Sequence, residues 1–473
     1  MYEAEEKALR DYFGVLPAES GAVPDEALER AVRSGIGRGR ARRTAARRLR
    51  AAAGAAAAVL LLLFALPWLS GRTGELRSSR EAPLSWGSLE KYRAVAEGDI
   101  TVSSALDSGQ YTRIGSSSGE KNGYSFTVDA VIADRRGMIV LYTTENRTEE
   151  KVQIGGFQLK GKSPKAISLI SYSGWSEEEG RIGAVPHLIR INWADGYQPK
   201  GDWTASLTMT PDNAAALSAS SSKYRTVLQA PIKLDPAADI ASGKVRRLDK
   251  ELVIGGQSLT LEQAYYGTTG IYLDYMYGKD NSKQLFSAIK PTITEESGGK
   301  QPTTELTSST EMYRTDGGRT LIFENDNRNA NGAMELHILG LQALDKTKLD
   351  LVVDTKRQRV LQGPDDKLSF SEQPAAKGQL ILSYQLGQLI GKDGSKQYLR
   401  YGINLEEDYT DGEGKRHRMD ANRSSSSYSG SSGEERQDFI YDLGTAAELP
   451  QPLTFRISSY PSPVLEAKTI RIR

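Results

Sequence analysis

The sequence of 473 residues contains no cysteine and only three histidines, at His187, His337 and His417. Without cysteine the chain cannot form disulfides, thiolate zinc sites or iron–sulfur clusters, and it has no thiol nucleophile. The three histidines lie far apart and show no zinc-binding spacing. A formal net charge of +1 excludes a globally basic nucleic-acid-binding protein and a globally acidic disordered chain. We therefore expect no metal, no cofactor and no nucleic-acid partner.

The sequence also lacks a complete catalytic or calcium-binding motif. Residues 115–119 read GSSSG and fit G-x-S-x-G, but a nucleophile elbow needs an apolar strand before it and a helix after it, and neither is predicted here. Residues 327–332 read NRNANG, like the start of a calcium loop, yet the leading Asp is missing and the twelfth position is Ile338. A hairpin loop between strands near 321–323 and 334–338 explains this segment better.

One acidic cluster could hold a hard cation. Its members are Glu406, Glu407, Asp408, Asp411 and Glu413. Because Lys415, Arg416 and Arg418 follow at once, we predict a solvated hairpin tip instead. No residue is predicted to be catalytic, and we expect that the protein is not an enzyme.

A single long apolar run is present. Residues 51–71 read AAAGAAAAVLLLLFALPWLSG, and no charge interrupts them. In a helix this segment spans roughly 31 Å at about 1.5 Å per residue, which matches the ~30 Å core of a bilayer. Trp68 stands where an interfacial aromatic residue belongs. We predict one transmembrane helix over 51–71.

The flanks of this run set its orientation. Basic side chains crowd the N-terminal flank: Arg38, Arg40, Arg42, Arg43, Arg47, Arg48 and Arg50. The positive-inside rule then places residues 1–50 in the cytoplasm and the long C-terminal part outside the plasma membrane. About 50 residues precede the run, whereas a cleaved signal peptide has only a short basic segment before its apolar core. This length favours a membrane span over a cleaved signal peptide.

The predicted cytoplasmic tail, residues 1–50, contains two short amphipathic helical patterns. Their apolar faces include Leu9, Tyr12, Phe13, Leu28 and Val32. Two such helices bury too little surface to fold alone. Docking of these five side chains into the groove of a partner is one interpretation. A solvated tail that has no partner is the other.

The region after the span alternates between apolar and polar residues, as β-strands do. A polar stalk and short helix are expected over 72–97, with the helix near 89–96. Three β-sandwich modules are expected over 98–240, 241–356 and 357–473, each ending in its own closing strand, near 232–234, 348–352 and 469–472. The Ser-rich run 422–435 reads as a loop.

An internal repeat supports the three modules. Five alternating apolar positions recur when 133 or 242 is added to the residue number. They are Phe126, Val128, Met138, Val140 and Tyr142 in the first unit, Leu259, Leu261, Ile271, Leu273 and Tyr275 in the second, and Leu368, Phe370, Leu380, Leu382 and Tyr384 in the third. The pattern predicts two paired strands with the same inward face in each unit.

Three segments carry a resemblance to a known family. Residues 122–146 read NGYSFTVDAVIADRRGMIVLYTTEN, and residues 88–102 read SLEKYRAVAEGDITV. Both resemble the domain-of-unknown-function 4179 family of anti-sigma-factor-like single-pass membrane proteins of Gram-positive bacteria, the second segment corresponding to a helix and a first strand. Residues 248–354 resemble the immunoglobulin-like domain that often follows. The resemblance implies a membrane-tethered signalling regulator whose tail holds a sigma factor.

Two functions follow as hypotheses. In the first, the outer modules sense the cell envelope, and the tail binds a regulatory partner such as a sigma factor. In the second, the protein is a surface adhesion or envelope-structural protein, and the tail serves only as a topology anchor. The sequence does not identify the extracellular ligand in either case.

The tail hypothesis can be tested by charge insertion on its apolar faces. Changing Leu9 and Phe13, or Leu28 and Val32, to Asp should abolish partner binding, because a buried charge in an apolar groove is strongly unfavourable. Membrane insertion should not change. The measurement is a pull-down from bacterial lysate with residues 1–50, scored by mass spectrometry against these variants. Equal capture by native and variant tails would disprove helix docking.

Overall fold

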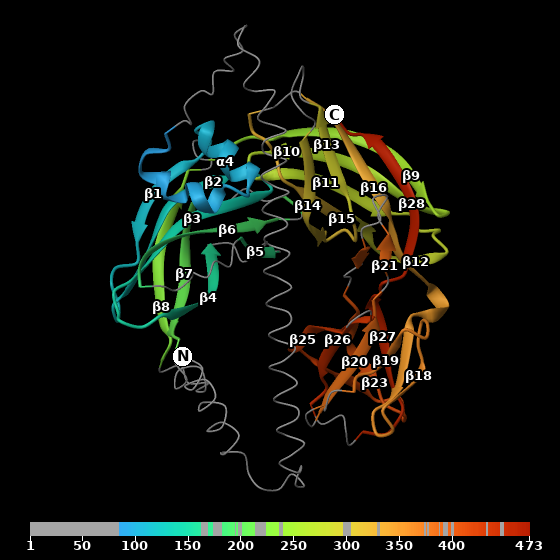
Figure 1. The fold of residues 1–473 in the computed structure, drawn as a ribbon. Helices are drawn as coiled ribbons and strands as arrows, with labels where there is room; N and C mark the ends of the chain where they lie inside the picture. The colour runs from blue at the N-terminus through green and yellow to red at the C-terminus, as the bar shows by residue number, and fades with distance from the viewer. Residues whose placement is uncertain are drawn as a thin grey trace, which may run out of the picture. The chain divides into compact units, whose positions relative to one another are not determined.

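Antiparallel β-sheets make up most of the chain in this computed structural model, which confirms the prediction of a mainly β protein (Figure 1). The chain divides into two units, Met1–Pro83 and Leu84–Arg473. The structure describes residues 85–473, with gaps at 162–168, 174–181, 194, 197–200, 213–223, 236–239, 297–303, 329–331, 373–374, 376–377, 387, 391–395, 399–401, 432–433 and 445–448.

The predicted span 51–71, the tail residues and the seven topology-determining arginines all lie outside the described residues. Within the described ranges no helix combines the length and the apolar character needed to cross a membrane.

Three short helical elements open the described chain: η1 (Gly87–Tyr92), α3 (Arg93–Ala96) and α4 (Ile100–Asp107). The first two correspond to the helix predicted near 89–96. The first strand that the family resemblance implies within 88–102 is wrong, because Ile100 begins α4. The cause is Asp99, which has extended backbone angles and caps the helix by accepting a hydrogen bond from the backbone N–H of Val102 at 3.1 Å.

The first module packs two sheets around one core. One sheet has the order β1 (Thr112–Ser117), β2 (Tyr124–Ala133), β3 (Gly137–Asn146), β6 (Gly183–Asn192) and β5 (Leu169–Ser173). The other contains β4 (Val152–Gly161), β7 (Gly201–Pro211) and β8 (Thr226–Leu234). Phe126 and Val140 meet Trp203 and Ile232 between the sheets. The opposite face of β2 and β3 packs against the helices.

The second module contains nine strands. They are β9 (Lys244–Ile254), β10 (Gln257–Gly267), β11 (Gly270–Tyr277), β12 (Lys283–Ile289), β13 (Thr292–Glu296), β14 (Thr304–Tyr313), β15 (Arg319–Phe323), β16 (Ala333–Asp345) and β28 (Pro463–Arg471). The first half of β14 pairs with β13 and its second half with β15, so β14 joins the two halves of the sheet. Strand β28, which is red in Figure 1, pairs with β16, which is orange.

The third module lies between β16 and β28 in the sequence. After η3 (Lys346–Lys348), one sheet has the order β18 (Arg359–Gln362), β17 (Asp350–Asp354), β27 (Leu453–Ser459), β23 (Asn404–Thr410) and β24 (Arg416–Arg418). The other contains β19 (Leu368–Phe370), β20 (Gln379–Gln385), β26 (Glu434–Asp442) and β25 (Asp420–Ser431). A separate pair is formed by β21 (Gln388–Ile390) and β22 (Lys396–Tyr398). The Ser-rich run predicted as a loop therefore lies largely in two paired strands.

Two of the predicted closing strands are wrong. The segment 348–352, expected to close the second module, includes β17, which pairs with β27 of the third module. The segment 469–472, expected to close the third, belongs to β28 and its end, and Ile472 is buried in the core of the second module. Relative to the predicted ranges 241–356 and 357–473, the two modules exchange their last strands.

The internal repeat is visible in the strand register. Val128 pairs with Tyr142 in the first module, and Leu261 pairs with Tyr275 at the same offset of 133 in the second. Both hairpins also carry a register shift immediately afterwards, between Val128 and Ala130 and between Leu261 and Gln263. In the third module Leu368 is the partner of Tyr384, so the register differs there by two residues.

His187 gives the first module a pH-dependent stability. Its ring stacks on Tyr142 and its Nε2 lies 2.8 Å from Thr144 Oγ1, and burial lowers its pKa from 6.5 to about 4. The unfolded chain therefore binds a proton at His187 more tightly than the folded chain does. The contribution of neutral His187 to the unfolding free energy is fully present above pH 6.5, and roughly 3 kcal/mol is lost as the pH drops to 4 and below.

We expect urea denaturation of the His187→Gln variant to show a smaller loss of unfolding free energy between pH 7 and pH 4.5 than the native chain shows. His337→Gln, in the second module, is the control and should keep the native pH dependence. An unchanged dependence in His187→Gln would contradict the assignment.

Candidate functional site at the module junction

The turns of two equivalent hairpins meet between the first and second modules. Residues 134–137 connect β2 to β3, and residues 267–270, offset by 133, connect β10 to β11. Asp134 is fully buried and joins the turns. Its Oδ1 accepts from the backbone N–H of Arg136 and Gly137 at 2.7 and 2.9 Å, and its Oδ2 accepts from Thr269 N and Oγ1 at 2.8 and 2.7 Å. Burial raises the pKa of Asp134 despite these four donors.

A buried ion pair fixes the same junction. Arg136 donates from Nη1 and Nη2 to the two carboxylate oxygens of Asp274 at 2.9 and 2.8 Å. The side chains are only 7% and 3% exposed. Gln263 and Thr320 also donate to Asp274, at 2.8 and 2.6 Å. Burial opposes ionisation of Asp274, but the hydrogen bonds and charge of Arg136 outweigh it and lower the pKa of this carboxyl group.

The turns approach so closely that side chains are excluded. A Cβ atom on Gly137 would lie 2.7 Å from Thr269 Oγ1 and even closer to the hydroxyl of Tyr272. A Cβ on Gly267 would overlap the carboxylate of Asp134. Both glycines are therefore required by the packing of one hairpin on the other.

Arg190 of β6 extends the junction to helix α4. Its Nη1 donates to the carbonyl oxygen of Thr269 and its Nη2 to Oδ2 of Asp99, each at 2.6 Å. Asp99 therefore caps α4 with one oxygen and binds the first module with the other. This guanidinium connects the helix with a strand of the first module and a turn of the second.

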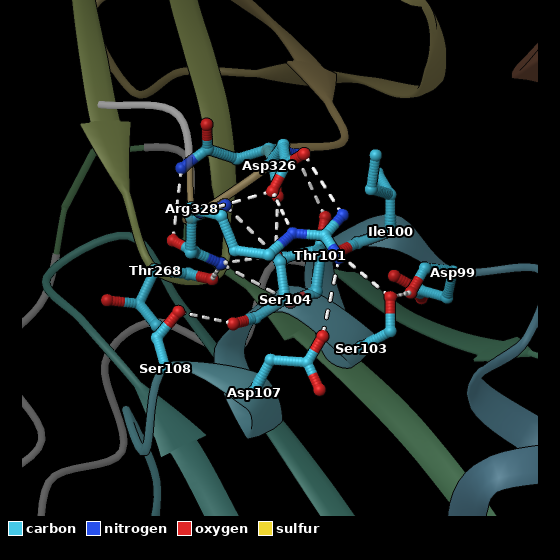
Figure 2. A network of polar contacts seen from close by, with 12 residues as sticks. Asp99, Ile100, Thr101, Ser103, Ser104, Asp107, Ser108, Thr268, Asp326 and Arg328 are labelled. Atoms are coloured by element: carbon cyan, nitrogen blue, oxygen red, sulfur yellow. Dashed lines mark hydrogen bonds and ion pairs between the residues drawn. The ribbon is translucent and has the colours of Figure 1, made fainter. Parts of the chain in front are cut away.

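The other side of α4 contacts the loop that follows β15 (Figure 2). The backbone N–H of Asn325 donates to Thr101 Oγ1 and that of Asn327 to Ser104 Oγ, both at 2.9 Å. The amide of Asn327 donates to the carbonyl oxygens of Thr101 and Thr268, at 3.3 and 3.1 Å. Asn327 thus joins the helix to both the loop and the β10–β11 turn.

An ion-pair chain closes the outer edge of this network. Arg328 contacts Asp326 at 2.8 Å and reaches Asp107 at the end of α4 at 3.3 Å. Figure 2 shows Arg328 above the helix, between these two carboxylates. Because Arg328 is half exposed, this pair adds little stability, and the buried hydroxyl and amide contacts hold the loop to α4.

The segment 327–332 is not the hairpin loop that its asparagines and glycine predict. The strands before and after it, β15 and β16, do not pair with each other. β15 pairs with β11 and β14, and β16 pairs with β12, β13 and β28. Asn327 uses its side chain to bind α4, a role that the local pattern could not reveal because the helix is more than 200 residues away in sequence.

The predicted hairpin at the acidic cluster is confirmed, but its tip is not fully solvated, because Asp411 is buried. β23 and β24 pair through Asp408–Arg418 and Thr410–Arg416. Asp411 lies at the tip, where it accepts from the backbone N–H of Glu413 and Lys415 and contacts His417 Nε2 at 2.8 Å. Within the described parts of the chain, no group of three or more His, Asp or Glu side chains is arranged to hold a metal ion.

The sequence-based search missed the junction residues. The internal repeat could have indicated these residues. The turn residues 134–137 and 267–270 stand at the same offset of 133 as the apolar positions, and each turn ends in glycine. Charged residues in a tight turn read as solvated, so nothing local indicated that Asp134 and Arg136 are buried. The predicted partner-binding residues of the tail lie in the other unit.

Comparisons with known proteins leave the family open. No family model matches the chain, and no curated protein matches it. Among solved structures, the crystal structure of a conserved domain protein from Bacillus anthracis is similar at 14% identity, covering 53% of this chain and 84% of the other, with a TM-score of 0.34. At that TM-score the likeness carries no inference about fold or function.

Neutralising Asp274 should loosen the junction. Asp274→Asn leaves the buried Arg136 without its counter-charge, and we expect a loss of about 3–5 kcal/mol in unfolding free energy by urea denaturation. Asp350→Asn removes a half-exposed pair with Arg456 at 2.9 Å and should cost less than about 1 kcal/mol. Equal losses of unfolding free energy in the two variants would show that the buried ion pair does not contribute more to stability than a half-exposed one.

Proposed function

We propose that this chain is a membrane-anchored envelope sensor and regulator with immunoglobulin-like outer modules and an anti-sigma-factor-like tail. The observation that supports the proposal is the position of α4. This helix follows the predicted span and stalk in sequence, and it is hydrogen-bonded to both of the modules that flank it. In this proposal a change at the module junction reaches the predicted stalk through α4.

The chemistry of the junction suits a two-state element. Its contacts are directional hydrogen bonds and one bidentate ion pair. The hydrogen bonds are lost once donor and acceptor separate beyond about 3.5 Å, whereas the attraction of the ion pair falls off gradually with distance. If an envelope ligand rotates the second module against the first, Asn325 and Asn327 leave α4, and Thr101 and Ser104 lose their partners. Such discrete rearrangements of packed interfaces are a common basis of switching.

The proposal assigns the tail a partner in the cytoplasm. The five apolar tail residues would hold a sigma factor while the junction is intact and release it when the junction opens. No catalytic step, cofactor or metal is part of this mechanism. If the tail has no specific partner, the outer modules alone carry the function, which then is surface adhesion or envelope structure.

The proposal can be tested with junction variants in the full-length chain. Gly137→Ala forces a methyl group against Thr269 and Tyr272, and Asn327→Ala removes the side-chain hydrogen bonds from Asn327 to Thr101 and Ser104 of α4. We expect each variant to retain about fivefold less sigma factor than the native chain when both are purified from cells, within the usual range of allosteric coupling. Gly156→Ala is the control, because its methyl group meets no atom within 4 Å.

Trypsin provides the structural readout. The peptide bond after Arg136 lies in the buried junction, so cleavage there reports that the junction has opened. Variants that open the junction but retain the native amount of sigma factor would refute the coupling role of α4. A native chain that captures no sigma factor, while its outer modules function on an unrelated tail, would favour the adhesion function.

A further inference from the structure

Unpaired positive charge gathers on one edge of the second module. Lys244, Arg246 and Arg247 follow one another in the first half of β9, and all three are exposed. Arg471 of β28 is exposed as well, and its Nε donates to the carbonyl oxygen of Arg473. Among the described residues, no carboxylate forms an ion pair with any of these four side chains. We call these four residues the basic edge.

The strand contacts show that the basic edge is one continuous surface. Within the described ranges, β9 pairs with β10 alone and β28 with β16 alone. The two strands meet where Lys250 Nζ donates to the carbonyl oxygen of Arg471 at 2.8 Å and Gly255 N donates to Glu466 Oε2 at 2.6 Å. β28 therefore runs beside the second half of β9 and leaves the half with Lys244, Arg246 and Arg247 uncovered.

Tyr266 connects the two ends of this surface. Its hydroxyl donates to the carbonyl oxygen of Ile472 at 2.9 Å, beside Arg471. Tyr266 is also the cross-strand partner of Lys244, so the end of β28 lies near the first residues of β9. Arg473 is already engaged by Glu295 at 2.5 Å.

Exposed arginines elsewhere, such as Arg225 and Arg359, also lack a carboxylate ion-pair partner among the described residues, so the basic edge differs in having its cations grouped on neighbouring strands. Many exposed or half-exposed arginines of the described chain have a carboxylate partner, including Arg147, Arg328, Arg416, Arg418 and Arg456. On β9 the two acids, Asp249 and Glu251, follow the basic residues and leave them unpaired. Unpaired cations on a free strand edge also oppose the addition of another β-strand, which argues against a strand as the partner.

We propose that the basic edge binds a linear phosphodiester polymer outside the cell. The cations lie along the length of a strand instead of converging on one point: Lys244 and Arg246 share one face, about 6.7 Å apart, and Arg247 projects from the other face. Such a row suits a repeating anion better than a single ion, and arginine matches phosphate with paired N–H donors. The inference deepens the proposed function, on which it rests for its extracellular setting, by naming the chemical class of the envelope ligand.

The test measures binding of poly(glycerol phosphate) to the full-length chain in detergent. The variant Arg246→Glu, Arg247→Glu and Arg471→Glu should bind more than tenfold more weakly at low salt. Its slope of log affinity against log salt should be shallower by about 2, since each phosphate contact on a single strand contributes about 0.7. The control variant Arg225→Glu, Lys356→Glu and Arg359→Glu changes the same net charge at other exposed positions and should bind as the native chain does.

Chemical footprinting locates the site independently of the basic tail. Bound polymer should protect Arg246, Arg247 and Arg471 from phenylglyoxal in the native chain, and circular dichroism should confirm that the variants fold. Equal losses of polymer affinity in the two triple variants would overturn the proposal, because binding would then depend on the net charge of the protein and not on the basic edge. Protection by anionic phospholipid vesicles but not by the polymer would overturn it in favour of a membrane surface. Because no signalling is measured, failure of the sensor mechanism would leave this result intact.

Discussion

The ion pair between Arg136 and Asp274 is the contact on which the arrangement of the first two modules depends. It joins hairpins from different modules and is almost completely withdrawn from water. A buried pair of this kind gains little over apolar packing, but loss of one partner is severe, so its main effect is to permit one geometry and exclude others. The close approach at Gly137 and Gly267 enforces the same geometry by steric means. The junction is therefore specified twice, by charge and by shape.

Helix α4 is held in place by contacts to both modules at this junction. Its serine and threonine hydroxyls, the side chains that ordinarily weaken a helix, bind the loop after β15. Its capping residue Asp99 binds Arg190 of the first module. An eight-residue helix that is marginal by itself is thus stabilised by contacts to both modules. Its order depends on theirs, which is the property that a coupling element requires.

Periodicity predicted the fold class and the repeat because both reside in alternating apolar residues such as Val128 and Tyr142. It could not assign β28, whose residues alternate normally but whose partner β16 is chosen by the core that receives Ile472. Asp99 is a typical N-cap residue, whereas the family resemblance implied a strand after the first helix. Asp134 and Arg136 could not be assigned as buried, because their partners are more than 130 residues away. The junction therefore needed a structure, whereas the β architecture did not.

The return of β28 to the second module has a consequence for biogenesis. The chain is synthesised from its N-terminus, so residues 463–471 emerge after the whole third module. Until then β16 lacks its pairing with β28. The core of the third module is built mostly from its own strands, but it also includes Phe286 of β12 and Leu344 of β16. The second module is completed last, although it precedes the third along the chain. Synthesis of β28, rather than of its own first strands, thus times the maturation of the sheet that carries the basic edge.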